Sequence, residues 1–146
     1  GMTRLPGLMK LLATLRNNEP DLLISLHCDS SAKDPNRHEA AIWHWVGDPK
    51  PMRRAQSLAL ATALDAALSD PGHRIAENVL VKSAPIHRAG GTQLIPGILR
   101  HGKQAACLIE MGFLSDCHTR AAMVTPQWQE LAAAGIDAGI RAFAQT

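Results

Sequence analysis

Hydrophobic positions along the chain follow two spacings, one typical of amphipathic helices and one typical of buried strands. Leucines and a methionine recur at helical spacing over residues 5–15 and predict an amphipathic helix of about three turns. Apolar runs at 21–28 and 104–111 are bounded by polar or glycine residues, which is the pattern of buried strands in a parallel sheet. Residues 39–46 and 77–82 are expected to form two further strands, of which the second has the weaker pattern.

Two long helices and one long connection complete the pattern. An alanine- and leucine-rich segment at 52–69 predicts a helix that ends at Asp70-Pro71-Gly72, and residues 126–143 predict the last helix. The apolar side of the last helix consists of Trp128, Leu131, Ala132, Ile136, Ile140 and Phe143. Residues 83–103 contain several glycines and are expected to be a functional or partly helical connection. Strands that alternate with helices predict an α/β fold, with a mostly parallel sheet flanked by helices.

The composition fits one ordinary globular domain over residues 2–146. Of the 146 residues, 46% are hydrophobic and 19% are charged, so disorder, which needs lower hydrophobicity, is not expected. The formal net charge of +2, with basic residues scattered along the chain, gives no support for nucleic-acid binding. No apolar run approaches the roughly 20 residues that a membrane-spanning helix needs. The first residues show no secretion signal, and Gly1 before Met2 resembles the remainder of a tag.

The three cysteines, Cys28, Cys107 and Cys117, form no C-x-x-C pair. Their odd number and wide spacing do not fit a disulfide framework. Cys28 and Cys107 fall inside apolar strands, so we expect both to be unreactive thiols in the core.

His27 stands at the end of the first apolar strand, just before the polar residues Asp29 and Ser30. Alternation along a strand places it on the same face as Leu23 and Ser25. A neutral imidazole at this position can donate a ring nitrogen to Zn²⁺. The structural alternative is a hydrogen-bonded histidine that closes the strand, and the strand pattern alone leaves both interpretations open.

Glu110 ends the apolar run at 105–109 and is the second candidate for chemistry. Burying a carboxylate is costly unless it is paired or protonated, and burial raises its pKa toward the range of a general base. The structural alternative is an ion pair with Arg100 or Lys103. Because functional groups gather at the carboxyl ends of parallel strands, we expect Glu110 and His27 to share one cleft. An imidazole with a carboxylate is the minimum that metal-assisted hydrolysis needs.

The remaining histidines carry weaker signals. Each lies in or beside a predicted loop or strand without a partner motif, so we expect solvated side chains rather than metal ligands. They are His38, His44, His73, His87, His101 and His118. Neither a phosphate-binding glycine loop nor a serine-nucleophile motif is present in the sequence.

Together, these segments resemble the zinc-dependent N-acetylmuramoyl-L-alanine amidases, the cell-wall hydrolases that cut the bond between muramic acid and the stem peptide. The similar segments are DLLISLH at 21–27, the helix containing Ser57-Leu58-Ala59, ILRHGKQAACLIEMGFLSD at 98–116, and the closing helix. Thr3-Arg4 and the leucine-rich helix that follows resemble the stretch before the first segment in that family. The resemblance covers nearly the whole chain.

The resemblance implies an amidase-like (phosphorylase/hydrolase-like) α/β domain whose zinc is held by two histidines and a glutamate, with a second glutamate that activates water. By position, His27 resembles the later zinc ligand and Glu110 resembles the catalytic glutamate. Ser25 is a candidate for orienting His27, and Arg100 is a candidate for contacting the substrate, peptidoglycan or a muropeptide. The implied activity is hydrolysis of the amide bond between N-acetylmuramic acid and L-alanine by a zinc-activated water.

The chain also departs from the family pattern. In the family, an earlier strand ending in Gly-His-Gly carries the first zinc histidine and a following helix supplies the glutamate ligand; neither pattern is present here. We therefore expect the chain to correspond to the C-terminal two-thirds of the family's catalytic domain. Weak zinc binding is expected, because catalytic sites need three protein ligands. The absent elements would leave a sheet edge open, through which we expect the chain to form homo-oligomers.

The sequence leaves two other functions open. The first is a non-catalytic peptidoglycan-binding or interaction remnant of the same family. The second is a related zinc carboxypeptidase or N-acyl amino acid amidohydrolase. The substrate of the amidases places the expected activity outside the cytoplasmic membrane, in the bacterial cell wall or periplasm, or with a lysin of phage type.

Overall fold

The computed structural model of the protein describes residues 20–84 and 96–146, together with shorter pieces of the chain. These pieces are residues 10, 13–14 and 17–18, and the backbone at 86–87 and 93–94. The helix predicted at 5–15 therefore lies mostly outside the described residues, although the described residues within it are helical.

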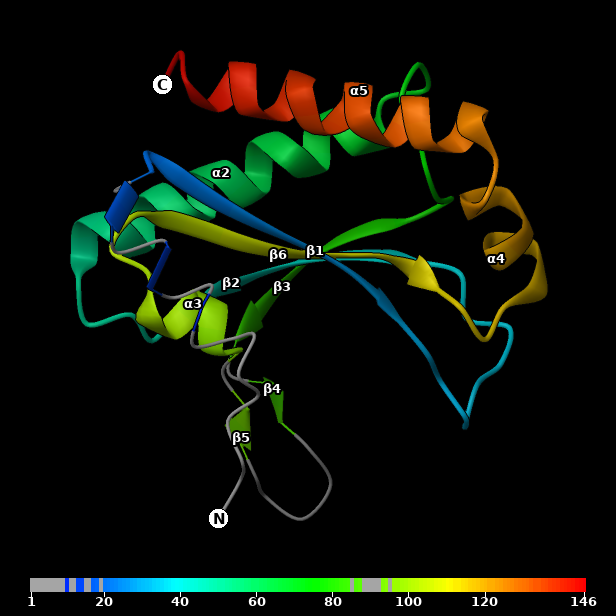
Figure 1. Ribbon diagram of the computed structural model, residues 1–146, viewed down its shortest axis with the longest axis horizontal. Coiled ribbons are helices and arrows are strands. Elements are labelled where there is room, and N and C mark those ends of the chain that lie inside the picture. The colour runs from blue at the N-terminus through cyan, green and yellow to red at the C-terminus, as the bar shows by residue number, and fades with distance from the viewer. Residues whose placement is uncertain are drawn as a thin grey trace.

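A four-stranded sheet forms the centre of the described structure (Figure 1). Its strands are β1 (Leu22–Asp29), β2 (Ala40–Trp45), β3 (Val79–Ala84) and β6 (Ala105–Phe113), in the order β1-β6-β2-β3. The pairs β1–β6 and β2–β3 are parallel, whereas β2 runs antiparallel to β6. The sheet is therefore mixed but mostly parallel, which confirms the predicted α/β class.

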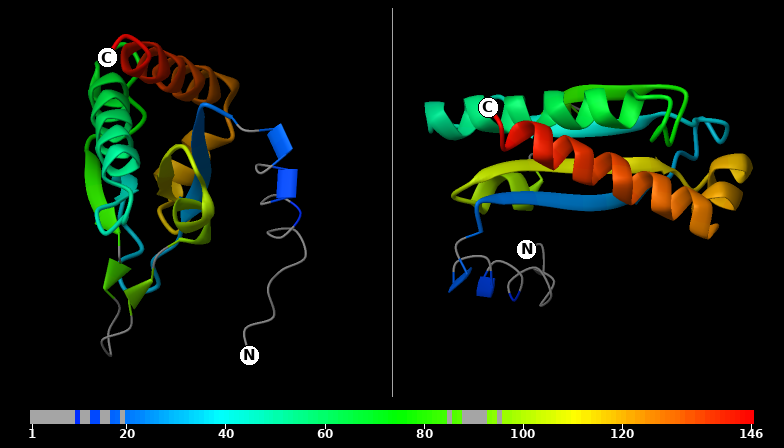
Figure 2. Two further views of the ribbon diagram at one scale, coloured as in Figure 1. Left: turned by 90° about the vertical axis from the view of Figure 1, so that its left-hand side faces the viewer. Right: turned by 90° about the horizontal axis from the view of Figure 1, so that it is seen from above.

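In the described part of the chain, four helices surround the sheet. They are α2 (Pro51–Ser69), α3 (Gly97–His101), α4 (Cys117–Met123) and α5 (Pro126–Phe143). The long helices α2 and α5 pack together on one side of the sheet, and α3 lies on the other side (Figures 1 and 2). Both long helices begin at a proline, whose fixed φ suits a first helical turn. None of the described helices is long and apolar enough to cross a membrane.

The strand β6 is buried on both faces, because it lies between β1 and β2 and is covered from two sides. One face contributes to the main core with α2 and α5 through Ala105, Cys107, Ile109 and Met111. On the other face, Leu108 packs with Ile98 and Leu99 of α3 in a second core. Burial on both faces explains why this segment reads as an almost continuous apolar run.

Helix α5 approaches α2 closely through two glycines. A Cβ atom at Gly135 would lie 2.7 Å from Leu68 Cδ2, and one at Gly139 would lie 2.9 Å from the Cα of Leu64. The residues of α5 that are fully buried are consequently small, namely Ala132, Gly135 and Gly139. Leu131, which was expected on the apolar side, is 40% exposed because that side is narrower than the apolar pattern indicates.

Three further segments show how the details compare with the prediction. The strand predicted at 77–82 is β3, which begins and ends two residues later. The connection at 83–103 is partly helical, as expected, because it contains α3, and Ile86–His87 (β4) pairs with Gln93–Leu94 (β5). The short helix α4 was not predicted; its sequence signal is Asp116, whose carboxylate accepts a hydrogen bond from the backbone N–H of Thr119 at 2.6 Å.

The two strand cysteines have different environments. Cys107 is fully buried, as expected, and burial raises the pKa of its thiol to about 12. Cys28 is exposed, so the prediction of a core thiol is wrong at this position. The reason is that β1 is the outer strand of the described sheet, and its second half is not covered by a helix.

Candidate active site at the paired strands β1 and β6

His27 and Glu110 occupy paired positions on the parallel strands β1 and β6. Paired residues on neighbouring strands point to the same face of a sheet, so both side chains leave the sheet on one side. That side is the one opposite α2 and α5, because Leu108, two residues before Glu110, packs in the second core. The structure thus brings together the two residues that the sequence singled out.

The carboxyl group of Glu110 lies in an environment that disfavours its charged form. Its Oε2 atom is buried and has no hydrogen-bond partner among the described residues. Burial, and to a smaller extent the charge of Asp29, raises the pKa of Glu110 to about 7. A cation beside the carboxylate would lower this pKa, so the alternative of a structural ion pair has no support at Glu110. A carboxyl group that titrates near neutrality can both accept and return a proton.

The imidazole of His27 is exposed and contacts Ser25 on its own strand. The distance between Ser25 Oγ and His27 Nε2 is 2.9 Å, which is a hydrogen bond whose direction depends on the histidine tautomer. Ser25 was predicted to orient His27, and it does contact the ring. A zinc ion at Nε2 would replace this hydrogen bond, whereas coordination through Nδ1 would retain it.

Arg100 is not brought to this pair. It lies in α3, at the N-terminal end of β6, and its side chain is exposed. The five residue steps along β6 from Ala105 to Glu110 span about 17 Å. A role for Arg100 in substrate contact therefore remains a prediction for a more distant part of the substrate.

Asp29 is a neighbour of the pair that the sequence did not single out. A register irregularity between His27 and Asp29 follows the regular pairing of β1 with β6. The backbone oxygen of Asp29 accepts a hydrogen bond from Leu114 N–H at 2.8 Å, and its carboxylate accepts one from Ser30 N–H at 2.7 Å. In the sequence, Asp29 is marked only as a polar residue directly after the strand predicted at 21–28, and such residues are too common to indicate a functional site.

Trp43 and Lys82 are paired on β2 and β3 and lie on the same side of the sheet as Leu108 and Glu110. Arg37 pairs with Glu39, which lowers the pKa of that carboxyl group, and Lys82 lies 3.6 Å from Glu39. The ammonium group of Lys82 is also 5.5 Å from the ring centroid of Trp43. These contacts tie the two cations to Glu39 and Trp43, so neither cation acts on the pKa of Glu110.

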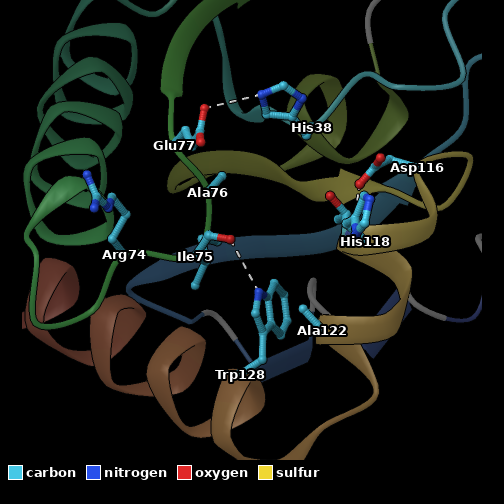
Figure 3. A pocket seen from close by; sticks show the side chains of 10 residues that line it. His38, Arg74, Ile75, Ala76, Glu77, Asp116, His118, Ala122 and Trp128 are labelled. Carbon is cyan, nitrogen blue, oxygen red and sulfur yellow. Dashed lines mark hydrogen bonds and ion pairs between the residues drawn. The ribbon is translucent and has the colours of Figure 1, made fainter.

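A cavity of about 500 Å³ lies at one end of the sheet, between the entry to β2, the entry to β3 and α4 (Figure 3). It is lined by His38, Arg74, Ile75, Ala76, Glu77, Asp116, His118, Thr119, Ala122 and Trp128. His38 pairs with Glu77 at 3.4 Å, and Trp128 Nε1 donates to the backbone oxygen of Ile75 at 3.3 Å. Its lining includes neither His27 nor Glu110, so the cavity and the pair are separate features.

The other histidines follow the expectation of solvated side chains with one exception. His38, His101 and His118 are exposed, His73 is partly exposed, and the side chain of His87 lies outside the described residues. His44 is only 4% exposed, so its prediction is wrong, and burial lowers its pKa. His44 is two residues after Ile42 on β2, so both side chains lie on the same face of the sheet. Ile42 packs against α2, so His44 also faces α2 rather than Glu110.

The described residues do not complete the zinc site that the sequence resemblance implies. Within them, no three His, Cys, Asp or Glu side chains converge closely enough to hold a metal ion. A catalytic zinc site requires three protein ligands, and His27 provides one imidazole. This donor set does not fit a tightly bound zinc, so we assign no reaction step to the metal in this chain.

Comparison with known proteins relates this arrangement to a family. Among solved structures, the amidase AmiC2 of Nostoc punctiforme aligns with a TM-score of 0.74 and 15% identity over 94% of this chain and 66% of its own. The CwlV catalytic domain from Bacillus (Paenibacillus) polymyxa var. colistinus aligns with a TM-score of 0.73 and 19% identity, over 94% of this chain and 65% of its own. An N-acetylmuramoyl-L-alanine amidase from Clostridium difficile 630 aligns with a TM-score of 0.75 and 18% identity, over 95% of this chain and 66% of its own.

These likenesses establish the fold, and the chain spans slightly less than two thirds of each of those solved chains. No curated protein matches it in sequence. The family model described as N-acetylmuramoyl-L-alanine amidase matches residues 5–142, which is nearly the whole chain. The protein therefore belongs to the N-acetylmuramoyl-L-alanine amidase family.

Proposed function

We propose that residues 2–146 form an amidase-type domain that acts on the amide bond between N-acetylmuramic acid and L-alanine in peptidoglycan. Membership of the family supports the substrate class. The observation that carries the proposal is the Glu110 carboxyl group, which has a buried unpaired oxygen, a pKa of about 7, and His27 as its neighbour on the next strand. This substrate places the proposed activity outside the cytoplasmic membrane.

In this proposal Glu110 performs the proton transfers. Its carboxylate takes a proton from water as the water oxygen attacks the amide carbon, and its carboxyl group then returns the proton to the leaving nitrogen of L-alanine. A buried carboxyl group suits this exchange because its pKa lies close to the working pH. His27 would supply one imidazole donor if a zinc ion were bound, and the further donors would have to come from outside the described residues.

A second function is favoured by the incomplete donor set. With one imidazole and no convergent set of three ligands among the described residues, the domain is also suited to bind muropeptides without cleaving them. Lys82 and Trp43, on the same side of the sheet as Glu110, would then serve recognition alone. This second function predicts binding to insoluble peptidoglycan without release of new amino groups.

One experiment separates these functions. Purified protein is incubated with peptidoglycan, with and without added zinc, and new L-alanine amino termini and sedimented protein are both measured. Cleavage that falls about 10²- to 10⁴-fold in Glu110→Gln supports the amidase. The matched control is Glu77→Gln, because Glu77 is 81% exposed and lies away from the pair. Cleavage that persists in Glu110→Gln, or faster cleavage of small N-acyl amino acids, would contradict the proposal, and binding without cleavage would favour the second function.

A further inference from the structure

The cavity of about 500 Å³ at the end of the sheet has the size of a site for a small ligand (Figure 3). Segments that lead into β2 and β3 meet α4 and α5 there. The described residues that line it include neither His27 nor Glu110, so its role is separate from the proposed reaction. The chemistry of its two walls indicates what kind of ligand it accepts.

One wall of the cavity is apolar. It is formed by Ile75, Ala76, Ala122 and Trp128. The indole N–H of Trp128 is already used, because it donates to the backbone oxygen of Ile75 at 3.3 Å. The side chains of this wall therefore offer hydrophobic contact to a ligand rather than hydrogen bonds.

The other wall carries the carboxylate of Asp116, which lies across the cavity from Trp128 in Figure 3 and is only 6% exposed. Hydrogen bonds from Thr119 are the main reason that the pKa of Asp116 lies below its ordinary value. The nearby imidazoles of His118 and His38 act in the same direction, so this carboxylate is charged at neutral pH. A carboxylate has about four acceptor sites, and those that Thr119 leaves free can accept hydrogen bonds from a ligand.

The other charged groups that line the cavity lie apart from this carboxylate. Glu77 is 81% exposed and pairs with His38 at 3.4 Å on the rim. Arg74 extends away from Asp116 in Figure 3. While the imidazoles are neutral, the cavity thus combines a sheltered negative charge with an apolar wall.

We propose that this cavity binds a primary ammonium group on a short aliphatic chain, with the ammonium at Asp116 and the chain against Ile75 and Trp128. An ammonium group has three donors and the charge opposite to that of a carboxylate. The methylene groups of the chain gain from contact with the apolar wall. Free aliphatic amines and the side chain of lysine share this chemistry. The proposal does not depend on the proposed function, because Glu110 takes no part in it.

NMR titration with matched small molecules tests the charge preference. The indole N–H signal of Trp128 reports on the cavity, because this group bonds to Ile75 within the lining. We expect pentylamine to shift this signal saturably, and pentanol and pentanoate to bind at least about tenfold more weakly. A peptide with one lysine should bind as well if the ligand is a lysine side chain, and pentylamine alone should bind if it is a free amine. Absence of a saturable shift, equal binding of the three pentyl compounds, or a preference for pentanoate would overturn the proposal.

Replacement of Asp116 tests the role of its charge. Asp116→Asn removes the charge and keeps the N-cap of α4, because asparagine caps helices about as well as aspartate. We expect the dissociation constant for pentylamine to rise at least about tenfold. The matched control is Asp137→Asn, an exposed aspartate on α5, which should leave it unchanged. Undiminished binding in Asp116→Asn would refute the assignment.

Filling the cavity tests the location without a change of charge. Ala122→Leu places a larger side chain in the lining and should weaken binding of pentylamine, again about tenfold or more. Ala121→Leu is the matched control, since Ala121 is exposed on the same helix and outside the lining. Equal effects of these two variants would show that the amine binds elsewhere.

Binding should also weaken as the pH falls through the range in which imidazoles gain protons. His38 interacts with Glu77 and Asp116, and His118 interacts with Asp116, whereas Arg74 keeps its charge throughout. A proton on either imidazole adds a positive charge that competes with the ammonium for Asp116. Binding that is unchanged or stronger at acidic pH would contradict the proposed contact.

Discussion

The carboxylate of Asp29 lies close enough to Glu110 for its charge to raise the pKa of Glu110, in addition to the larger effect of burial. The two residues come from different strands, β1 and β6, so this effect on the pKa of Glu110 depends on the folded structure. Their relationship makes the acid–base behaviour of the site measurable without any substrate.

The free energy of unfolding should fall as the pH rises through the range of Glu110. The pKa of this group is about 7 in the folded protein, against 4.5 as the ordinary value. Between these values the folded state binds the proton more strongly, so the stabilisation is full below pH 4.5 and is lost as the pH rises to about 7. Glu110→Gln should remove a contribution on the order of 2 kcal/mol to this pH dependence. Urea unfolding at several pH values measures this contribution. If the free energy of unfolding changed equally with pH in the variant and the parent, the assignment to Glu110 would be contradicted.

Replacement of Asp29 by asparagine should lower the pKa of Glu110, because it removes a neighbouring negative charge. The shift should be smaller than the whole perturbation, since burial is the larger cause. Carboxyl carbon NMR titration of Glu110 measures it directly. Asp137→Asn is a suitable control, because Asp137 pairs with Arg141 on α5, far along the chain from the site. An unchanged or higher pKa in Asp29→Asn would show that the two carboxylates do not interact.

Zinc should bind weakly to this chain. The described residues offer one imidazole at His27 and no convergent group of three ligands, and tight sites need three. Elemental analysis after dialysis should find less than one zinc per chain, and a chelator should remove it. Stoichiometric zinc that resists a chelator and persists in His27→Ala would show that other side chains form the site.

Gly139→Ala should destabilise the protein although alanine favours helices. The new methyl group would meet the backbone of Leu64 at 2.9 Å, and a backbone atom cannot move aside as a flexible side chain can. Such overpacking costs about 1–3 kcal/mol. Thermal unfolding compared with Ala134→Ser, an exposed position on the same helix, measures it. A higher melting temperature in Gly139→Ala would mean that the α2–α5 contact is looser than described.

The sequence predicted the elements whose apolar pattern is long and regular. Helix α5 begins and ends where expected, at Pro126 and Phe143, since a proline start and a helical repeat mark it. Strand β6 was found for a similar reason, as an unbroken apolar run. Helix α4 was missed because it has only seven residues and none of them is buried, so no periodicity marks it.

Environment was harder to predict than element type. Cys28 and Cys107 have the same strand context in the sequence, yet one is exposed and the other is buried. Their difference depends on whether a strand is at the edge or the centre of the sheet, which is a long-range property. The pairing of His27 with Glu110 was expected from parallel strands, whereas the influence of Asp29 depends on side-chain distances that no local pattern encodes.

The antiparallel direction of β2 relative to β6 determines which loops line the cavity at the end of the sheet, and so what insertions or deletions in those loops would change. The strands β2 and β3 run in the opposite direction to β1 and β6. The segments that lead into β2 and β3 therefore lie at the same end of the sheet as the segments that follow β1 and β6. His38 and Glu77 reach the cavity from entering segments, and Asp116 reaches it from a departing one. Insertions or deletions in these loops would therefore reshape one shared hollow while leaving every strand in place.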